Sequence, residues 1–180
     1  FPDALCVSIN EAVVHGIPSD EPFKEGDLIG IDLGMKYKGL YTDTALTVPV
    51  GKISKEAQQL LDVTKKALEI AIKQLKVGGY ISDIGQTIEK FVKPHKYGIV
   101  RDLAGHGVGR QVHEDPSVPN YDTGKKSVKI FDGMVIAIEP MLVMGGDWRV
   151  KTRDNKWDVV SKDGSLTAHF EHSIAITKDG

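Results

Sequence analysis

An internal repeat is the feature of this chain that most constrains its fold. Residues 26–32 and residues 133–139 each begin with Gly, continue through an apolar stretch typical of a β-strand, and reach a carboxylate six residues after the Gly. In each case a second strand-like segment follows and opens with another carboxylate, Asp43 in the first copy and Glu171 in the second. The repeat predicts two related halves whose acids meet at a pseudo-two-fold site.

Composition and charge exclude several classes of protein. The 180 residues are 41% hydrophobic and 27% charged, which is typical of a globular protein, and we expect residues 1–180 to form a single domain. A net charge of -2 argues against general attraction to nucleic acid or anionic membranes, and no apolar run approaches the roughly 18 residues of a transmembrane helix. Cys6, the single cysteine, cannot form an internal disulfide, which indicates a cytoplasmic location. Because the chain begins at Phe1, we expect an upstream segment to be missing.

Two helices and several strands predict an α+β fold. The first helix should begin at Ser54, a good N-cap, and stop at Gly78-Gly79. The second should begin near Ser82 and end before Pro94. Apolar, β-branched stretches predict strands at residues 28–33, 46–50, 134–138 and 173–177.

The carboxylates at the ends of these strands need a partner. Burying an isolated carboxylate costs several kcal/mol unless it is paired, protonated or bound to metal. A hairpin turning around residues 36–39 would place Asp32 and Asp43 roughly opposite one another. Cross-strand neighbours on one face have Cβ atoms only ~5 Å apart, where like charges repel. Capping of a strand or pairing with Lys or Arg is the alternative for any one acid, but the four predicted acid-bearing strands contain neither. A bound cation would offset the repulsion of all four acids.

A histidine in a glycine-rich loop completes a candidate ligand set. His106 lies within residues 105–109, where three glycines allow close approach of the backbone, and the context lacks the Lys of a phosphate-binding loop. A structural hydrogen bond is the alternative role for such a histidine. One imidazole and four carboxylates suit divalent ions such as Mn, Fe(II) or Co(II), and two such ions would balance the ligands' formal charge. The predicted ligands are Asp32, Asp43, His106, Glu139 and Glu171.

Three other histidines are expected to lie outside this site. His95 is predicted to be at the surface. His169 and His172 flank Glu171, and we expect their side chains to face away from it.

Taken together, these motifs resemble those of the type I methionine aminopeptidases. The resemblance is carried by residues 8–18, the eleven-residue spacing of Asp32 and Asp43, and residues 105–116, 138–140 and 170–172. It implies the "pita-bread" fold that these enzymes share with Xaa-Pro peptidases: a pseudo-two-fold, curved antiparallel sheet with helices on its outer face.

The resemblance also implies a role for each site residue. Asp43, His106, Glu139 and Glu171 would hold one ion, and Asp32 would hold the other with Asp43 and Glu171 bridging. Glu139 would exchange protons with the attacking water. The implied substrate contacts are His15 and His113 near the scissile bond, and Cys6, Trp157 and Phe1 around the methionine side chain. Val112 departs from the larger aromatic residue that is frequent in the family, which affects the expected shape of the pocket.

The activity implied by the resemblance is metal-dependent removal of N-terminal methionine from nascent polypeptides, with a small second residue preferred. We expect two divalent ions, a monomer, and contact with nascent chains and possible contact with the ribosome. Two alternatives remain. An Xaa-Pro aminopeptidase or dipeptidase would usually carry an Arg shortly after the second Asp, and none lies between residues 43 and 51. A non-catalytic binding module with this fold typically loses several ligands, whereas all five are present here.

Overall fold

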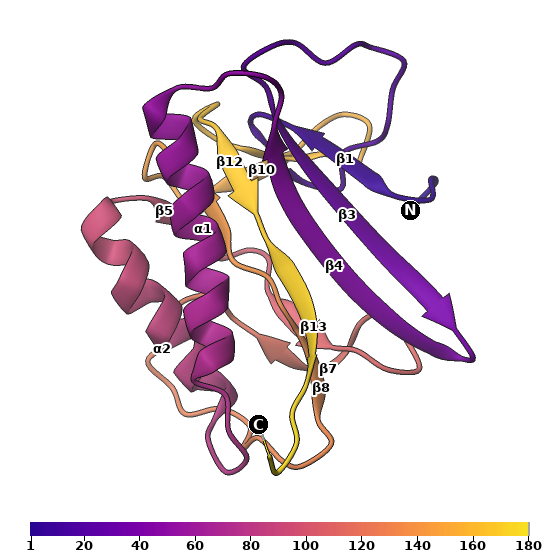
Figure 1. The fold of residues 1–180 in the computed structure, drawn as a ribbon, viewed down its shortest axis with the longest axis vertical. Coiled ribbons are helices and arrows are strands. Elements are labelled where there is room, and N and C mark those ends of the chain that lie inside the picture. Colours follow the sequence, from indigo (N-terminus) through magenta and orange to yellow (C-terminus); the bar gives the residue numbers. More distant parts are fainter. Residues whose placement is uncertain (180) are drawn as a thin grey trace.

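A curled, seven-stranded antiparallel sheet forms the framework of the molecule (Figure 1). The structure is a computed structural model that describes residues 1–179. The strands run in the order β1 (Cys6–Ile9), β3 (Leu28–Tyr37), β4 (Leu40–Pro49), β13 (Glu171–Ala175), β8 (Val135–Ile138), β6 (Gly105–Gly107) and β7 (Glu114–Val118). This order fits the expected pseudo-two-fold arrangement, because the strands of the first half of the chain lie on one side of the β4–β13 junction and those of the second half lie on the other.

The internal repeat is confirmed as a repeat of structure. The strand pair β3–β4 of the first half corresponds to the pair β8–β13 of the second. Each pair is closed in the same way: the Gly26 amide donates to the Val50 carbonyl and the Gly133 amide donates to the Ile176 carbonyl, both at 2.9 Å. Both glycines have positive φ, 99° and 85°, a conformation that side chains disfavour. The shared Gly therefore marks the point at which the chain enters each half-sheet.

The β3–β4 hairpin is longer than predicted. Its turn is Lys38-Gly39, where both residues have positive φ, as a tight two-residue turn requires. Beyond the expected strand at residues 28–33, Met35 and Tyr37 continue the alternation of side chains along β3. The hairpin extends because this alternation persists to the turn.

Two helices pack against the second half. The N-cap of α1 (Lys55–Lys73) is Ser54, as predicted, and its Oγ accepts a hydrogen bond from the Ala57 amide at 3.0 Å. The helix ends before the predicted Gly78-Gly79 stop, because the intervening residues form turns and the Gly78 amide bonds to the Ile130 carbonyl.

The second helix, α2 (Ile81–Val92), begins near Ser82 as predicted, with Tyr80 at its N-cap, and a short 3-10 turn, η1 (Lys93–His95), follows it. The Asp83 carboxylate accepts a hydrogen bond from the Tyr80 amide at 2.9 Å. Because Ile81 is fully buried, the first turn of α2 contributes to the core rather than to the surface.

The main core lies between the helices and the second half of the sheet. Leu60 and Leu68 of α1 and Ile84 of α2 are almost fully buried with strand residues such as Ile136. Two small sheets complete the fold: β10 (Val150–Thr152), β11 (Val159–Ser161) and β2 (Ala12–Val14), and β12 (Thr167–His169), β9 (Met141–Val143) and β5 (Gly98–Ile99).

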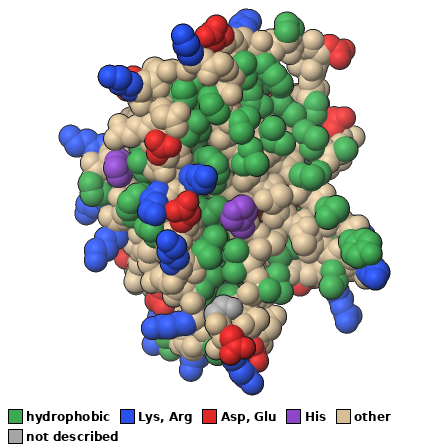
Figure 2. All heavy atoms as spheres, in the orientation of Figure 1, with side chains coloured by type: hydrophobic (Ala, Val, Ile, Leu, Met, Phe, Trp, Pro, Cys, Tyr) green, Lys and Arg blue, Asp and Glu red, His purple; other side chains and the backbone are tan. Residues whose placement is uncertain are grey.

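Helices lie on the outer face of the sheet, as expected, but the outer face of the first half is bare. Ile31, Leu33 and Leu46 project from this face with 37%, 42% and 45% of their surfaces exposed. Figure 2 shows hydrophobic side chains gathered over β3 and β4. In the described part of the chain, the helices cover only the half that contains β8 and β12. Neither of them is long and apolar enough to cross a membrane.

Candidate metal centre

Three carboxylates project from the inner face of the sheet around one small residue. Asp32 on β3 pairs with Ala45 on β4, and Ala45 in turn pairs with Glu171 on β13. Asp43 precedes Ala45 by two residues, so its side chain lies on the same face. The buried Ala45 therefore separates Asp32 from Glu171 without filling the space above it.

Asp32 and Asp43 lie close together on one face, as predicted, but not in the predicted register. Asp43 pairs with Gly34, and Asp32 is its diagonal neighbour. The turn is centred on Lys38-Gly39, one residue further along than the sequence suggested, and this shift moves the register by two residues. A two-residue shift keeps both acids on one face, and their side chains still interact.

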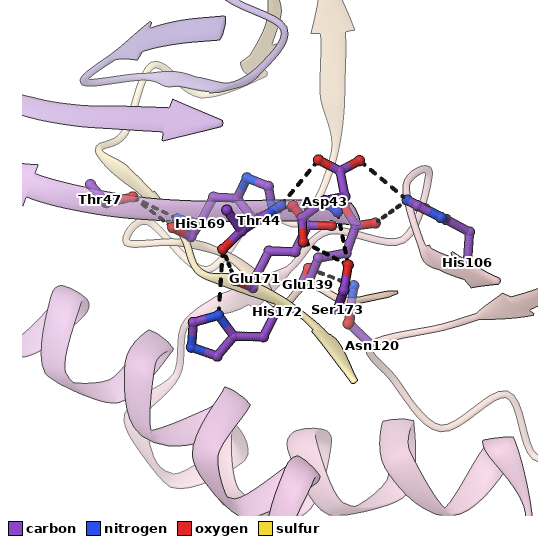
Figure 3. A network of polar contacts seen from close by, with 10 residues as sticks. All are labelled: Asp43, Thr44, Thr47, His106, Asn120, Glu139, His169, Glu171, His172 and Ser173. Carbon is purple, nitrogen blue, oxygen red and sulfur yellow. Dashed lines mark hydrogen bonds and ion pairs between the residues drawn. The ribbon is translucent and has the colours of Figure 1, made fainter. Parts of the chain in front are cut away.

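His106 and Glu139 approach the same place from the second half (Figure 3). The His106 Nε2 atom lies 3.5 Å from Glu139 Oε1 and 3.9 Å from Asp43 Oδ2. The other ring nitrogen of His106, Nδ1, is 2.9 Å from the Gly107 carbonyl, to which it donates. This contact leaves the lone pair of Nε2 directed at the acids, the orientation that a metal-binding imidazole requires.

The glycines beside His106 allow β6 to enter the crowded sheet. A Cβ atom on Gly105 would lie 2.3 Å from the Ala137 carbonyl oxygen, and one on Gly107 would lie 2.2 Å from the Asp115 carbonyl oxygen. Both distances are far below any non-bonded contact. The glycine-rich loop therefore serves close packing of the backbone rather than phosphate binding.

The predicted ligands form two groups that share Glu171. One group is Asp32, Asp43 and Glu171, and the other is His106, Glu139 and Glu171; within each, one candidate ligand atom per residue lies within 4.8 Å of the others. A third group joins His113 to Asp43 and His106. Glu171 Oε1 is buried without a hydrogen-bond partner. An oxygen-rich set with an unsatisfied buried carboxylate fits a divalent cation.

The electrostatics of the cluster also favour a cation. The ion pairs that these acids make with other described residues are with histidines alone, not with Lys or Arg. Burial, and then the neighbouring Asp43, raises the pKa of Asp32 to about 7. Burial also raises the pKa of Glu139 and that of Glu171, with further contributions from the surrounding acids. Without a cation, the cluster therefore holds protons at neutral pH.

A cavity of about 540 Å³ opens beside the cluster. The predicted substrate residues line it together with Val112: they are Phe1, Cys6, His15, His113 and Trp157. The Phe1 and Trp157 rings meet edge to face with centroids 5.5 Å apart. Burial, and then the nearby Asp32, raises the pKa of Cys6 to about 12, so its thiol stays protonated and forms part of the wall.

The two histidines expected near the scissile bond, His113 and His15, have different surroundings. The His113 ring packs edge-on against His106, with centroids 4.3 Å apart. His15 has a positive φ of 59°, which is uncommon for a residue other than glycine and typical of a functional position. Burial, and then the neighbouring His113, lowers the pKa of His15, which favours its neutral form.

The loop that carries Trp157 is tied to the loop that carries His15. Asp158 Oδ1 accepts hydrogen bonds from the Ile17 amide at 3.3 Å and from Asn155 Nδ2 at 2.7 Å. These bonds hold one wall of the cavity in place although the residues lie far apart in the sequence.

The prediction that His169 faces away from Glu171 is wrong. His169 is 4% exposed, lines the cavity, and places Nε2 3.7 Å from Glu139 Oε2 and 3.9 Å from Glu171 Oε2. Residues two apart on an extended chain share a face, so the His169–Glu171 spacing is the signal that could have found it. His172 is exposed and contacts Thr44, as an outward-facing residue should.

Comparison with known proteins places the chain in a family. Residues 1–178 match the model of metallopeptidase family M24. The methionine aminopeptidase of Aquifex aeolicus is 49% identical over an alignment that covers all of this chain and 70% of that protein. The crystal structure of methionine aminopeptidase from Thermotoga maritima has a TM-score of 0.93 at 46% identity, covering 97% of this chain and 70% of the other.

A more distant neighbour shares the fold. The prolidase from Pyrococcus horikoshii has a TM-score of 0.75 at 27% identity, covering 98% of this chain and 45% of that one. The curled sheet is thus the pita-bread fold, and the acids and His106 lie on its concave side. By sequence over almost its whole length, the chain belongs to metallopeptidase family M24.

Proposed function

We propose that this protein is a methionine aminopeptidase, a metal-dependent hydrolase that removes the N-terminal methionine from polypeptides. The observation that carries the proposal is the meeting of acids from both halves with His106 beside a cavity, in a chain 49% identical to a named methionine aminopeptidase. Its substrates would be nascent polypeptides with a small second residue, in the cytoplasm, where the protein would act as a monomer.

The proposed metal complement is two divalent ions. Asp32, Asp43 and Glu171 would contribute to one position, and His106, Glu139 and Glu171 to the other, with Asp43 also within reach of His106. Mn, Fe(II) and Co(II) suit one imidazole with four carboxylates. Such ions acidify water and polarise a carbonyl oxygen.

The chain's own residues supply the remaining steps. Glu139 lines the cavity and would accept a proton from the attacking water and return it to the leaving nitrogen. His113 and His15 line the same cavity and would donate hydrogen bonds to the scissile peptide, which is worth about 3 kcal/mol per donor in comparable sites. The protonated Cys6 thiol and the Trp157 ring would contact the methionine side chain.

The test is hydrolysis of Met-Ala-Ser before and after chelation. We expect free methionine from the metal-loaded protein, loss of activity in chelator, and recovery when Mn²⁺ or Co²⁺ is returned. An Ala-Pro peptide should remain uncleaved. Cleavage of Ala-Pro but not Met-Ala-Ser would identify an Xaa-Pro peptidase instead, and metal binding without cleavage of either peptide would identify a binding module.

A further inference from the structure

His169 has a fixed backbone and a side chain directed into the cavity. It is the last residue of β12, and Phe170 separates it from β13. Its amide donates to Thr47 Oγ1 and its carbonyl accepts from the same hydroxyl, both at 2.9 Å. These two bonds fasten the main chain of His169 to β4, so the direction of the imidazole is set by the sheet.

The imidazole of His169 faces the carboxylate to which the proposed function assigns proton transfer. Its Nε2 atom lies 3.7 Å from Glu139 Oε2 and has no hydrogen-bond partner. The other oxygen of the same carboxylate, Oε1, lies 3.5 Å from His106 Nε2. Figure 3 shows the Glu139 carboxylate between the two rings. A small rotation of the carboxylate would bring His169 Nε2 within hydrogen-bond distance, and such contacts often tighten when a site is loaded.

The two histidines differ in the nitrogen that carries the proton. The Gly107 carbonyl holds the proton of His106 on Nδ1 and leaves Nε2 as an acceptor. Among the described residues, His169 makes its hydrogen bonds through its main chain, and carboxylate oxygens of Glu139 and Glu171 are what its Nε2 meets. A proton on Nε2 attracts both carboxylates, whereas a lone pair there would repel them.

We infer that His169 is a positioning residue for Glu139, which it holds by donating a hydrogen bond from Nε2 to Oε2. His106 and His169 then have different roles. His106 presents a lone pair on one side of the Glu139 carboxylate, and His169 presents an N–H group on the other side. The inference rests on the proposed role of Glu139.

Two substitutions test whether His169 acts as a hydrogen-bond donor or only fills space. In His169→Gln the carboxamide can still donate to Glu139, whereas His169→Leu fills similar space without a donor. We expect His169→Leu to lower kcat for Met-Ala-Ser by about 10–100-fold with little change in KM, which is the usual effect of losing a hydrogen bond to a residue at a metal site. His169→Gln should recover most of that loss. The matched control is His172→Leu, on the exposed side of the same segment, which should keep the parent kcat.

Two further measurements are independent of activity. The ¹⁵N spectrum of histidine-labelled, metal-free protein should show the Nε2–H tautomer for the signal that disappears in His169→Gln. Calorimetric titration with Co²⁺ should give the parent stoichiometry for His169→Gln. The inference is overturned if His169 is the Nδ1–H tautomer, if His169→Gln is as impaired as His169→Leu, or if both variants bind less Co²⁺, which would make the imidazole a ligand. Because the spectrum and the titration need no substrate, they also read out if the parent fails to cleave Met-Ala-Ser.

Discussion

At the scale of single residues, the site depends on carboxylates that burial holds in an unfavourable environment. Glu139 is the clearest case, because burial raises its pKa well above the usual value and the residue also lies beside the cavity. A buried carboxylate with a raised pKa destabilises the metal-free fold when it ionises. Activity and stability should therefore respond in opposite directions when its charge is removed.

The substitution Glu139→Gln tests this opposition. We expect it to lower kcat for Met-Ala-Ser by roughly 10²–10⁴-fold, the usual contribution of a proton-transfer group, and to raise the melting temperature of metal-free protein at pH 8. Kinetics and calorimetry check the two effects, with Glu21→Gln at an exposed position as the control. A variant that keeps the parent kcat while loaded with metal would remove Glu139 from the proton-transfer role.

The sequence alone identified the acids and His106 but not the partner of Glu139. The acids follow apolar strand segments at repeated positions, so strand alternation was enough to place them on one face. His169 was misjudged although its two-residue spacing from Glu171 places both side chains on one face of an extended chain. What local periodicity does not encode is the pair of hydrogen bonds by which Thr47, on a distant strand, holds the backbone of His169.

At the scale of elements, β6 shows how closely the backbone must pack to present His106. Gly107 lies where an added Cβ would be 2.2 Å from the Asp115 carbonyl oxygen, which belongs to the neighbouring β7. Backbone atoms cannot move aside as a flexible side chain can. The strand that carries the candidate ligand is thus restricted to glycine beside it.

Gly107→Ala should therefore destabilise the protein and disturb the metal centre together. We expect a loss of about 1–3 kcal/mol in the free energy of unfolding, as for overpacking in a core, and weaker Co²⁺ binding because β6 must shift. Denaturant unfolding and calorimetric titration measure the two effects. Gly30→Ala is the matched control: it lies in a strand, and its nearest contact would be an ordinary 3.4 Å to the Ser8 side chain. Equal effects of the two substitutions would contradict the argument.

The helices and strands themselves were largely predictable, and their ends were not. Ser54 marked the start of α1 through a local hydrogen bond, which the sequence encodes directly. The end of α1 depends on the bond between Gly78 and Ile130, and the register of the β3–β4 hairpin on the conformation of Lys38-Gly39. The start of α1 is thus determined by a local hydrogen bond, whereas the end of α1 depends on a tertiary contact and the hairpin register on the geometry of its turn.

At the scale of the whole molecule, the acid cluster links stability to pH. Asp32 has a pKa of about 7 in the folded chain against an ordinary value of 3.8, so between these limits the folded state binds more protons than the unfolded state. Linkage then requires the contribution of Asp32 to stability to fall as pH rises from about 4 to about 7. The buried histidines act in the opposite direction, because burial lowers the pKa of His106 and that of His169.

The difference in melting temperature between the parent protein and Asp32→Asn isolates the contribution of Asp32 to stability. In chelator, we expect the melting temperature of the variant to exceed that of the parent by an amount that grows between pH 4 and pH 7, by roughly 2–4 °C for each kcal/mol relieved. Added Mn²⁺ should reverse the order at pH 7, because the parent alone keeps the full ligand set. Scanning calorimetry at several pH values checks both, and a difference that stays constant with pH would show that Asp32 is not strained.

The junction between β4 and β13 has a consequence for how the two halves hold together. In register, the seam is short: Ala45 pairs with Glu171 and Thr44 with His172, with Ser173 bonded to Asp43 beside them. The proposed ions would straddle this seam, since each half supplies ligands to them. The ions would therefore hold the two halves together in addition to their role in hydrolysis. Removing them should speed amide hydrogen exchange along β4 and β13 before exchange speeds up in the helical core.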